Sequence, residues 1–581
     1  MKKLKFRNIL GKKHLFFDGS MSTMLQIEGL KDEYIPELWN FKKPDTIKKI
    51  HMAYLEAGAD IIKTNTFGAH PSRIKSTTYS TYNIVYKGVS LAVKTIDEFI
   101  SQTKLKRQFI PFVATSLGPG KHLLKSPRDI FFDKAYKDFA LQVKAAHDGG
   151  SDLILLENMR DTYELKAAIL AAKENSELPI IVSCILNEKG HMPTGGNIAS
   201  IVSLVEGLGV DAVGLSCDFN PDNPAPFAFE LMRESGLPIF LNHNARLTKE
   251  KKTDKLSPSA FAKEVCAIAK HGLHLMGGCY GTEPAHIKAL ISTYKKSVFP
   301  FIPPKKKNIT VLSSCSKTVE IGKTPIIVGE KINPGGNKAL KTAIKSNDFD
   351  YIALLAKKQA NLCPVLDVNM GLPGLNEAKL LKESIIKIQE TVDIPLMIDT
   401  VNPVAMEQAL KYYNGKACIN SVSGKKSSMD KIFPLVKKYG GLVIAMTLDD
   451  SGIPETAEKR VQVAEKIIEE GSKYGLDKKD FIVDPLTLTI SSDPSSPTVT
   501  LAALKILTEK GFKTALGISN ISFGLPARDS INATFFSLAL REGLSCGIAN
   551  PFSNSLLSSY YATLALINKG EHCVNYITFF K

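Results

Sequence analysis

The sequence lacks the features that mark several classes of protein. Its nine cysteines form no CxxC pair and no ladder of close spacings, which argues against a disulfide framework and favours a reduced compartment. A membrane span needs roughly 18 consecutive apolar residues, and no such run is present. The apolar stretch after the basic N-terminus is interrupted by Asp18 and Ser20, so it does not fit a signal segment. We therefore expect a soluble, cytoplasmic protein without a membrane partner.

Arginine is scarce as well. The chain has 74 basic and 58 acidic residues, a net charge of +16, and only ten of the basic residues are Arg. Sequence-specific nucleic-acid sites favour the planar guanidinium group, whereas scattered Lys residues mainly create a diffuse positive field. The composition thus argues against a nucleic-acid partner and favours the attraction of a small anionic substrate.

Two domains are expected, because 581 residues exceed the roughly 250 to 300 that one hydrophobic core supports. Short β-branched runs alternate with amphipathic stretches throughout, as in repeated βα units around a parallel sheet. The first half holds eight such runs, at residues 15–19, 60–68, 110–118, 152–159, 179–186, 211–218, 238–244 and 273–279. The second half holds eight more, at residues 325–333, 364–371, 395–400, 417–424, 441–448, 481–488, 513–524 and 544–551.

This rhythm predicts an α/β protein of two tandem (β/α)8 TIM barrels, over residues 1–297 and 325–581. Residues 298–324 are rich in Pro and Lys, a composition that resists helix formation and predicts a linker. An open doubly wound sheet is the alternative for either half. The absence of GxGxxG after the first strand argues against its dinucleotide-binding form.

Reactive groups of such barrels project from the C-terminal ends of the strands. In the first half these ends carry Asp18, Asn65, Thr66, Glu157, Cys184, Cys217, Asn244 and Cys279. Cysteine packs as a small buried hydrophobe in most proteins, but thiolates from separate strands can also converge on one zinc ion. A catalytic zinc needs three protein ligands, and Cys217 and Cys279 supply two.

Carboxylates and carboxamides end the strands of the second half. They are Glu330, Asn333, Asp367, Asn369, Asp399, Asn420, Asp484 and Asn520. Asp and Asn often cap strands and form turns, which accounts for each of them singly but poorly for the whole set. A ring of hydrogen-bond acceptors and amides matches the edges of a flat, neutral heterocycle and does not suit phosphate.

Several motifs add a family resemblance. DGSMSTML (18–25), TNTFGA (64–69), GLSC (214–217) and GGCYGT (277–282) resemble the homocysteine S-methyltransferase barrel. VGEKINPGG (328–336), LDVNMG (366–371), INSVSG (419–424) and GISNISFGLPAR (517–528) resemble the pterin-binding, methyltetrahydrofolate methyltransferase barrel. In this order the two halves resemble the N-terminal half of the cobalamin-dependent methionine synthase family over nearly the whole chain.

For the first barrel the resemblance implies a zinc ion, held by three cysteines, that binds homocysteine as a thiolate. Cys217 and Cys279 match two of the ligands, but the third position is Tyr280, and a neutral phenol is a poor zinc ligand. Losing one thiolate weakens binding by several of the roughly 10 to 16 kcal/mol of a structural zinc site, which predicts weak zinc binding or none. Cys184 or His243 are possible substitutes. Asp18, Glu157 and Asn244 match positions around the homocysteine.

For the second barrel the resemblance implies a 5-methyltetrahydrofolate site. The residues expected to line the pterin ring are Asp367, Asn369, Asp399, Asn420 and Asp484. Glu330, Asn333 and Arg528 flank the pocket, and Asn520 lies near the reacting N5. Asn520 and Asp484 are the candidate catalytic residues, because a group that strengthens its hydrogen bond as charge changes at N5 stabilises the transition state.

The implied reaction moves the methyl group of methyltetrahydrofolate to cob(I)alamin and on to homocysteine, giving methionine. None of the eleven histidines lies in the DxHxxG context of a cobalamin domain. We therefore expect free cobalamin or a separate corrinoid protein as partner, unless the chain is truncated. Two alternatives stay open: a methyltransferase for the pterin step alone with a degenerate first barrel, and a folate-binding or docking module without activity.

Overall fold

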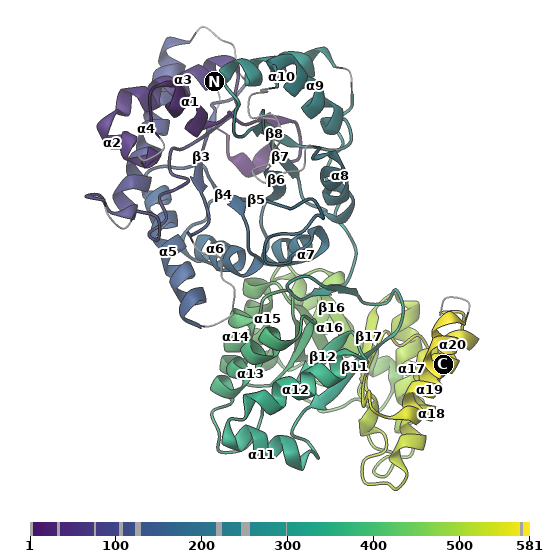
Figure 1. Cartoon of the computed structure of the whole chain (residues 1–581). Helices are drawn as coiled ribbons and strands as arrows, with labels where there is room; N and C mark the ends of the chain where they lie inside the picture. Colours follow the sequence, from purple (N-terminus) through teal and green to yellow (C-terminus); the bar gives the residue numbers. More distant parts are fainter. Residues whose placement is uncertain are drawn as a thin grey trace. The chain divides into compact units, whose positions relative to one another are not determined.

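The computed structural model describes residues 4–31, 35–74, 77–103, 108–121, 129–216, 223–245, 256–297, 299–569 and 573–581. It divides the chain into two compact units, Met1–Lys307 and Asn308–Lys581, each with helices around a central sheet (Figure 1). Within these described ranges, no helix is both long enough and apolar enough to cross a membrane.

The first unit is built on eight parallel strands. They are β1 (Leu15–Phe16), β2 (Ile61–Lys63), β3 (Phe112–Leu117), β4 (Leu153–Met159), β5 (Ile180–Cys184), β6 (Ala212–Ser216), β7 (Ile239–His243) and β8 (Leu275–Gly278). Each strand pairs with the next from β2 to β8, and β8 pairs with β1. A bridge between Phe17 and Ile61 joins the first strand to the second and completes the ring.

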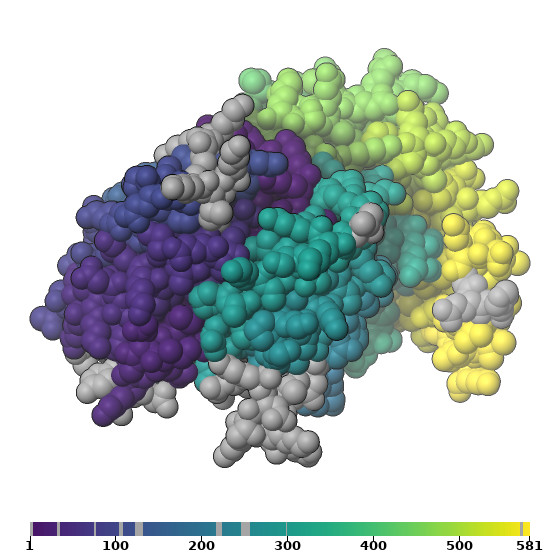
Figure 2. Space-filling model, turned by 90° about the horizontal axis from the view of Figure 1, so that it is seen from above, coloured from purple at the N-terminus to yellow at the C-terminus, as the bar shows by residue number. Residues whose placement is uncertain are grey.

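Helices cover the outside of this ring. They are α1 (Met21–Ile27), α2 (Trp39–Lys42), α3 (Pro44–Ala57), α4 (Thr81–Gln102), α5 (Asp129–Asp148), α6 (Thr162–Asn175), α7 (Ile198–Leu208), α8 (Ala225–Glu234), α9 (Pro258–Ala269) and α10 (Pro284–Lys296). Helix α7 shows how the sequence sets their ends. Asn197 and Ser200 form a capping box at its start, and Gly209 ends it with φ +74°. Figure 2 shows the purple first helices beside the teal last ones, as closure of the ring requires.

The second unit contains a closed barrel of eight parallel strands. They are β11 (Ile326–Ile332), β12 (Val365–Val368), β13 (Leu396–Asp399), β14 (Cys418–Ser423), β15 (Leu442–Met446), β16 (Phe481–Asp484), β17 (Lys513–Gly517) and β18 (Cys546–Ala549). The predicted fold, two tandem (β/α)8 barrels, is confirmed in both units.

The helices of the second unit follow the same alternation. They are α11 (Lys338–Ser346), α12 (Phe349–Ala360), α13 (Glu377–Thr391), α14 (Pro403–Tyr412), α15 (Lys426–Tyr439), α16 (Ala457–Ser472), α17 (Ser496–Glu509), α18 (Arg528–Arg541), α19 (Asn554–Leu566) and α20 (Val574–Phe580). A short 3-10 helix, η4 (Ile518–Asn520), follows β17 directly and carries a predicted site residue.

A segment before each barrel packs into the core at the N-terminal end of its strands. Phe6, in the 3-10 helix η1 (Phe6–Asn8), belongs to the core cluster of the first barrel. Leu312 and Ile321 belong to the core of the second, brought there by the antiparallel hairpin β9 (Val311–Ser313) and β10 (Thr318–Glu320). The predicted linker is therefore only partly a linker, since its second half is a hairpin of the second unit. The C-terminal strand ends stay available for chemistry.

Candidate functional site

The second unit gathers three carboxylates at the C-terminal end of its barrel. Glu330 lies on β11, Asp367 on β12 and Asp399 at the end of β13, and parallel pairing brings these strands side by side. The charges of Asp399 and Glu330 both act on Asp367, whose side chain is only 2% exposed. The structure thus brings together three residues that the sequence predicted as neighbours.

Three amides link these carboxylates. Asn369 donates to Asp399 at 3.0 Å and Asn333 to the same oxygen at 3.4 Å, while Asn420 donates to Asp367 at 3.3 Å. The amides and carboxylates together offer donors and acceptors on one surface. Such a surface can pair with the N–H and C=O groups of a flat heterocycle.

Burial changes the acidity of these groups. It raises the pKa of Asp367 well above its usual range, and the nearby Asp399 raises it further. Burial also raises the pKa values of Asp399 and Glu330. No cation hydrogen-bonds to Asp367 or Asp399 among the described residues, so a ligand that donates N–H groups would stabilise their ionised forms.

Asp484 ends β16, beside Met446 of β15. Burial raises its pKa to about 6, against the opposing effect of Arg460. Its carboxylate accepts from the backbone N–H of Leu486 at 2.8 Å, and Leu486 adopts the left-handed region with φ +68°. Arg460 on α16 holds this turn by donating to the carbonyl oxygens of Pro485 and Leu486 at 2.8 and 3.0 Å. Arg460 was not predicted as a site residue, because it lies on a helix 24 positions before Asp484 and not at the end of a strand.

Asn520 lies on the same end of the barrel, in η4, and is exposed. The adjacent Ser519 donates its hydroxyl to Glu330 at 2.8 Å, and its carbonyl accepts from Arg528 at 2.6 Å. Arg528 also donates to the Ser522 hydroxyl at 3.0 Å. These bonds fix the segment that carries Asn520 next to Glu330, so all nine predicted residues of this barrel lie at one end of it.

The first unit has a cavity of about 200 Å³ at the C-terminal end of its strands. Its lining residues are Ser20, Met21, Ser22, Pro36, Glu37, Lys63, Thr64, Asn65, Thr66, Phe67, Ser116, Glu157, Asn158, Cys279 and Tyr280. Predicted site residues Glu157, Cys279 and Tyr280 are among them. Asp18 lies beside the cavity through its contact with Lys63, and Asn244 follows β7 without lining it.

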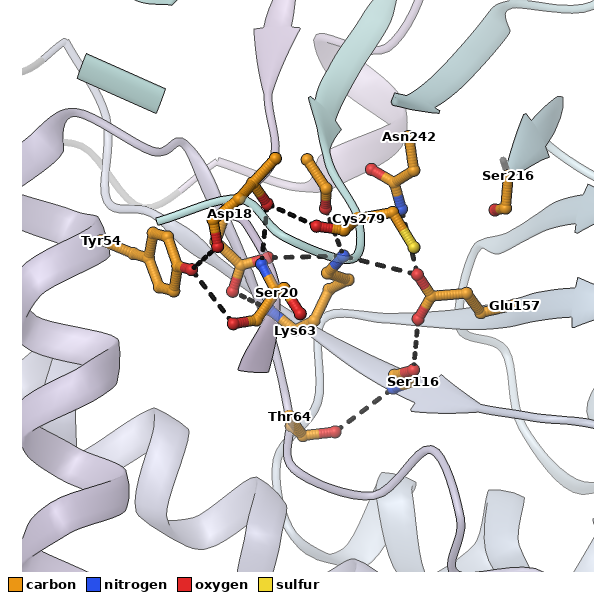
Figure 3. A network of polar contacts seen from close by, with 12 residues as sticks. Asp18, Ser20, Tyr54, Lys63, Thr64, Ser116, Glu157, Ser216, Asn242 and Cys279 are labelled. Atoms are coloured by element: carbon orange, nitrogen blue, oxygen red, sulfur yellow. Dashed lines mark hydrogen bonds and ion pairs between the residues drawn. The ribbon is translucent and has the colours of Figure 1, made fainter. Parts of the chain in front are cut away.

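Lys63 stands at the centre of the polar network in this cavity (Figure 3). Its Nζ donates to the Gly278 carbonyl at 3.1 Å, lies 3.4 Å from Glu157 Oε1 and lies 3.9 Å from Asp18 Oδ1. Glu157 also accepts from Asn242 at 3.0 Å and from the Ser116 hydroxyl at 2.6 Å. The network therefore joins side chains from five strands or strand ends around one ammonium group.

The ammonium is charged. Burial alone would lower the pKa of Lys63, but Glu157 and Asp18 outweigh this effect and raise it. Burial raises the pKa of Asp18 to about 7, despite the neighbouring ammonium. Lys63 was missed in the sequence, although a lysine ending the apolar run DIIK was a visible signal.

The two possible substitute zinc ligands, Cys184 and His243, do not face the interior of the barrel. Alternate residues of a strand face opposite sides. Ser183 bonds to Ser216 inside the barrel at 2.7 Å, and Asn242 bonds to Glu157, so the adjacent Cys184 and His243 face the helices. His243 stacks on Phe261 of α9 and bonds to Glu264 there at 2.9 Å.

Among the residues that the structure describes, the other donors do not complete a metal site. Burial raises the pKa of the Cys184 thiol to about 12, which disfavours the thiolate that zinc needs. Cys217 lies outside the described residues. Within the described part of the chain, no group of three His, Cys, Asp or Glu side chains could hold a metal ion. The cavity that Cys279 lines also holds a cation, Lys63, and a cation does not fit the surroundings of a zinc ion.

Two protein-family models match the chain, one in each of its two units. Residues 15–294 match the family described as homocysteine S-methyltransferase, and residues 329–550 match the family described as pterin binding enzyme. The chain therefore carries a homocysteine S-methyltransferase domain followed by a pterin-binding domain. Both the predicted resemblance and the predicted enzyme class, a methyltransferase, are confirmed.

Two similar curated proteins are methionine synthases. One from Mycobacterium leprae is 30% identical over 92% of this chain, and one from Mycobacterium tuberculosis is 29% identical over 94%. The chain spans about half the length of these relatives, 47% and 48%. The metallated homocysteine methyltransferase MmuM from Escherichia coli aligns at 22% identity and TM-score 0.42, over 48% of this chain and 96% of that one.

Proposed function

We propose that the chain transfers the methyl group of 5-methyltetrahydrofolate to a corrinoid in its cob(I) state and from there to homocysteine, forming methionine. The observation that carries the proposal is the carboxylate and amide surface of the second barrel, placed in one chain with a homocysteine S-methyltransferase domain. The similarity to methionine synthases supports the same pair of substrates.

In this proposal the second barrel binds and orients the pterin. Asp367 and Asp399 accept N–H groups of the ring edge, and Asn369, Asn333 and Asn420 hold the carboxylates in place. The raised pKa values of both carboxyls favour a ligand that donates hydrogen bonds, because pairing recovers the free energy that burial removes.

In this proposal Asn520 and Asp484 act near N5 of the pterin, the atom that carries the methyl group. The methyl group leaves N5 without its bonding electrons, the electron pair stays on N5, and a proton from solvent completes that nitrogen. The exposed Asn520 amide can strengthen a hydrogen bond to N5 during the transfer, which stabilises the transition state selectively. Asp484, with a pKa of about 6, can hold or release a proton near neutral pH.

A corrinoid supplies a strong cobalt nucleophile when bound. The corrinoid would dock on a set of exposed apolar residues around the mouth of the second barrel: Val401, Val404, Phe523 and Phe552. Val401 and Phe523 are 85% and 68% exposed, and each lies within three residues of a predicted site residue, Asp399 and Asn520. Such exposed apolar groups are typical of interaction surfaces. The corrinoid would come as free cobalamin or on a separate corrinoid protein.

The test uses the full chain with methyl-labelled 5-methyltetrahydrofolate, cob(I)alamin and homocysteine, and it measures labelled methionine. Labelled methionine that depends on all three compounds supports the proposal. Label that reaches cobalamin but never homocysteine supports the alternative of a pterin-step methyltransferase with a degenerate first barrel. Folate binding without any transfer supports a binding or docking module.

A further inference from the structure

The Lys63 ammonium is a fixed charge inside the first barrel. Lys63 ends β2 and its side chain is 8% exposed, so the charge is shielded from solvent. Two carboxylates on opposite sides, Asp18 and Glu157, keep it protonated (Figure 3). The buried ammonium depends on these two carboxylates, because an unpaired ammonium at that depth would be strongly unfavourable.

The ammonium also has hydrogen-bonding capacity left. An ammonium has three N–H donors. Among the described residues, Gly278 at 3.1 Å and Glu157 at 3.4 Å accept two of them, and Asp18 at 3.9 Å is too distant for a hydrogen bond. Because Lys63 lines the cavity, its third donor can reach a ligand there.

The Lys63 ammonium lies in the same cavity as Cys279, a predicted zinc ligand. Tyr280 lines this cavity as well. A zinc ion next to Cys279 would add two positive charges close to the ammonium, and like charges in a buried site repel strongly. The described donors thus favour one resident monovalent cation, Lys63, over a metal ion.

We propose that the cavity of the first barrel binds a small thiol substrate as its thiolate against the Lys63 ammonium, without a metal ion. This inference rests on the proposed function, in which the thiol is homocysteine. The S–H proton leaves to solvent when the thiol binds, and no electrons are transferred. An adjacent ammonium favours a thiolate for the same reason that a neighbouring lysine lowers a cysteine pKa.

The test is binding of homocysteine to the chelator-treated full chain, with metal content quantified. Titration calorimetry at pH 7 in two buffers of different ionisation enthalpy measures proton release. Since a free thiol has a pKa of about 8.5, we expect release of close to one proton per homocysteine bound. Added zinc is expected to leave the affinity within about twofold of its metal-free value, a change that is negligible in free energy.

Lys63→Met and Lys63→Arg form a matched pair. Lys63→Met keeps the length but removes the charge, and it should weaken homocysteine binding at least about tenfold and abolish proton release. Lys63→Arg keeps the charge and should retain proton release. Homoserine, which carries a hydroxyl in place of the thiol, stays neutral and should lose less affinity than homocysteine on Lys63→Met, because it loses only a hydrogen bond. Fluorescence of Trp39, the single tryptophan, reports whether the first barrel of each variant is folded.

Two outcomes overturn the inference in distinguishable ways. If chelation abolishes homocysteine binding and one equivalent of zinc restores it, the metal-free site is wrong while the proposed function stands. If homocysteine binds neither with nor without zinc, the proposed function of the first barrel fails as well. The comparison of the parent chain with and without zinc decides between these outcomes even if Lys63→Met does not fold.

Discussion

Arg460 offers a test of how the second barrel positions Asp484. Arg460 is 2% exposed, and its Nη1 donates to Pro485 O at 2.8 Å, Leu486 O at 3.0 Å and Thr500 Oγ1 at 3.1 Å. Replacing it with Met leaves the Pro485 carbonyl buried without its donor, while Leu486 O and Thr500 Oγ1 keep their bond to each other at 2.8 Å. The replacement also removes the cation that opposes the raised pKa of Asp484.

The magnitude follows from these contacts. A buried acceptor that loses its donor costs about 1 to 3 kcal/mol, so losing the bonds to Pro454 and Pro485 costs about 3 kcal/mol in total. An unfolding transition of a unit this size shifts by about 2 to 4 °C per kcal/mol. We therefore expect Arg460→Met to lower the melting temperature of the second unit by about 10 °C. Pterin affinity should fall as well, because the turn at Leu486, with φ +68°, loses its bonds to Arg460.

The assay separates the two units by their optical signals. The only tryptophan, Trp39, belongs to the first unit, so its fluorescence follows that unit alone, while far-UV circular dichroism follows both. Arg460→Met should shift the dichroism transition and leave the Trp39 transition unchanged, and Arg460→Lys should fall between Met and the parent. An unshifted dichroism transition, or an equal shift of the Trp39 signal, would refute the reasoning.

Three further predictions concern single residues. Burial raises the pKa of Asp484 from 3.8 to about 6. Its stabilising contribution is therefore complete below pH about 4 and lost as pH rises through 6, so urea unfolding should show a loss of about 2 kcal/mol between pH 4 and 7 that is absent in Asp484→Asn. Asn369→Ala removes the 3.0 Å bond to Asp399 and should weaken pterin binding about tenfold in a fluorescence titration. Unchanged affinity would contradict the supporting role given to Asn369. Gly278→Ala would place a Cβ 2.3 Å from Thr282 Oγ1, so calorimetry should show homocysteine binding lost and pterin binding kept.

Zinc affinity provides a separate check on Lys63. Tyr280→Cys adds the thiolate that the family resemblance places at that position, but the Lys63 ammonium remains beside it. We expect tight zinc only when Tyr280→Cys is combined with Lys63→Leu, measured as metal per chain after dialysis. One tight zinc in Tyr280→Cys alone would show that the ammonium does not oppose the metal.

The fold could be predicted because each barrel repeats one simple pattern. Apolar runs of strand length alternate with helical stretches, and both series of eight are present. The hairpin at 311–320 was not predicted, since its Pro- and Lys-rich surroundings resemble a linker and its packing depends on Leu312 meeting a distant core. Local composition does not reveal such a tertiary contact.

The sequence indicated more of the candidate site in the second barrel than in the first. In the second barrel, polar residues at strand ends are few and distinct, so the sequence predicted that Asp367 and Asp399 are neighbours, and the structure brings them together. In the first barrel, the possible substitute ligands Cys184 and His243 face the helices, because alternate residues of a strand face opposite sides and composition does not give the register. Lys63 was overlooked because lysines usually lie on the surface.

Methyl transfer from 5-methyltetrahydrofolate to free cob(I)alamin tests the central claim most directly. The reaction is followed by the loss of the cob(I)alamin absorbance under anaerobic conditions, with the parent chain and Asp367→Ala in parallel. The account predicts enzyme-dependent transfer by the parent and little or none by Asp367→Ala, with Lys63→Met as active as the parent because it alters only the first barrel. No transfer by the folded parent chain, or equal transfer by Asp367→Ala, would contradict it.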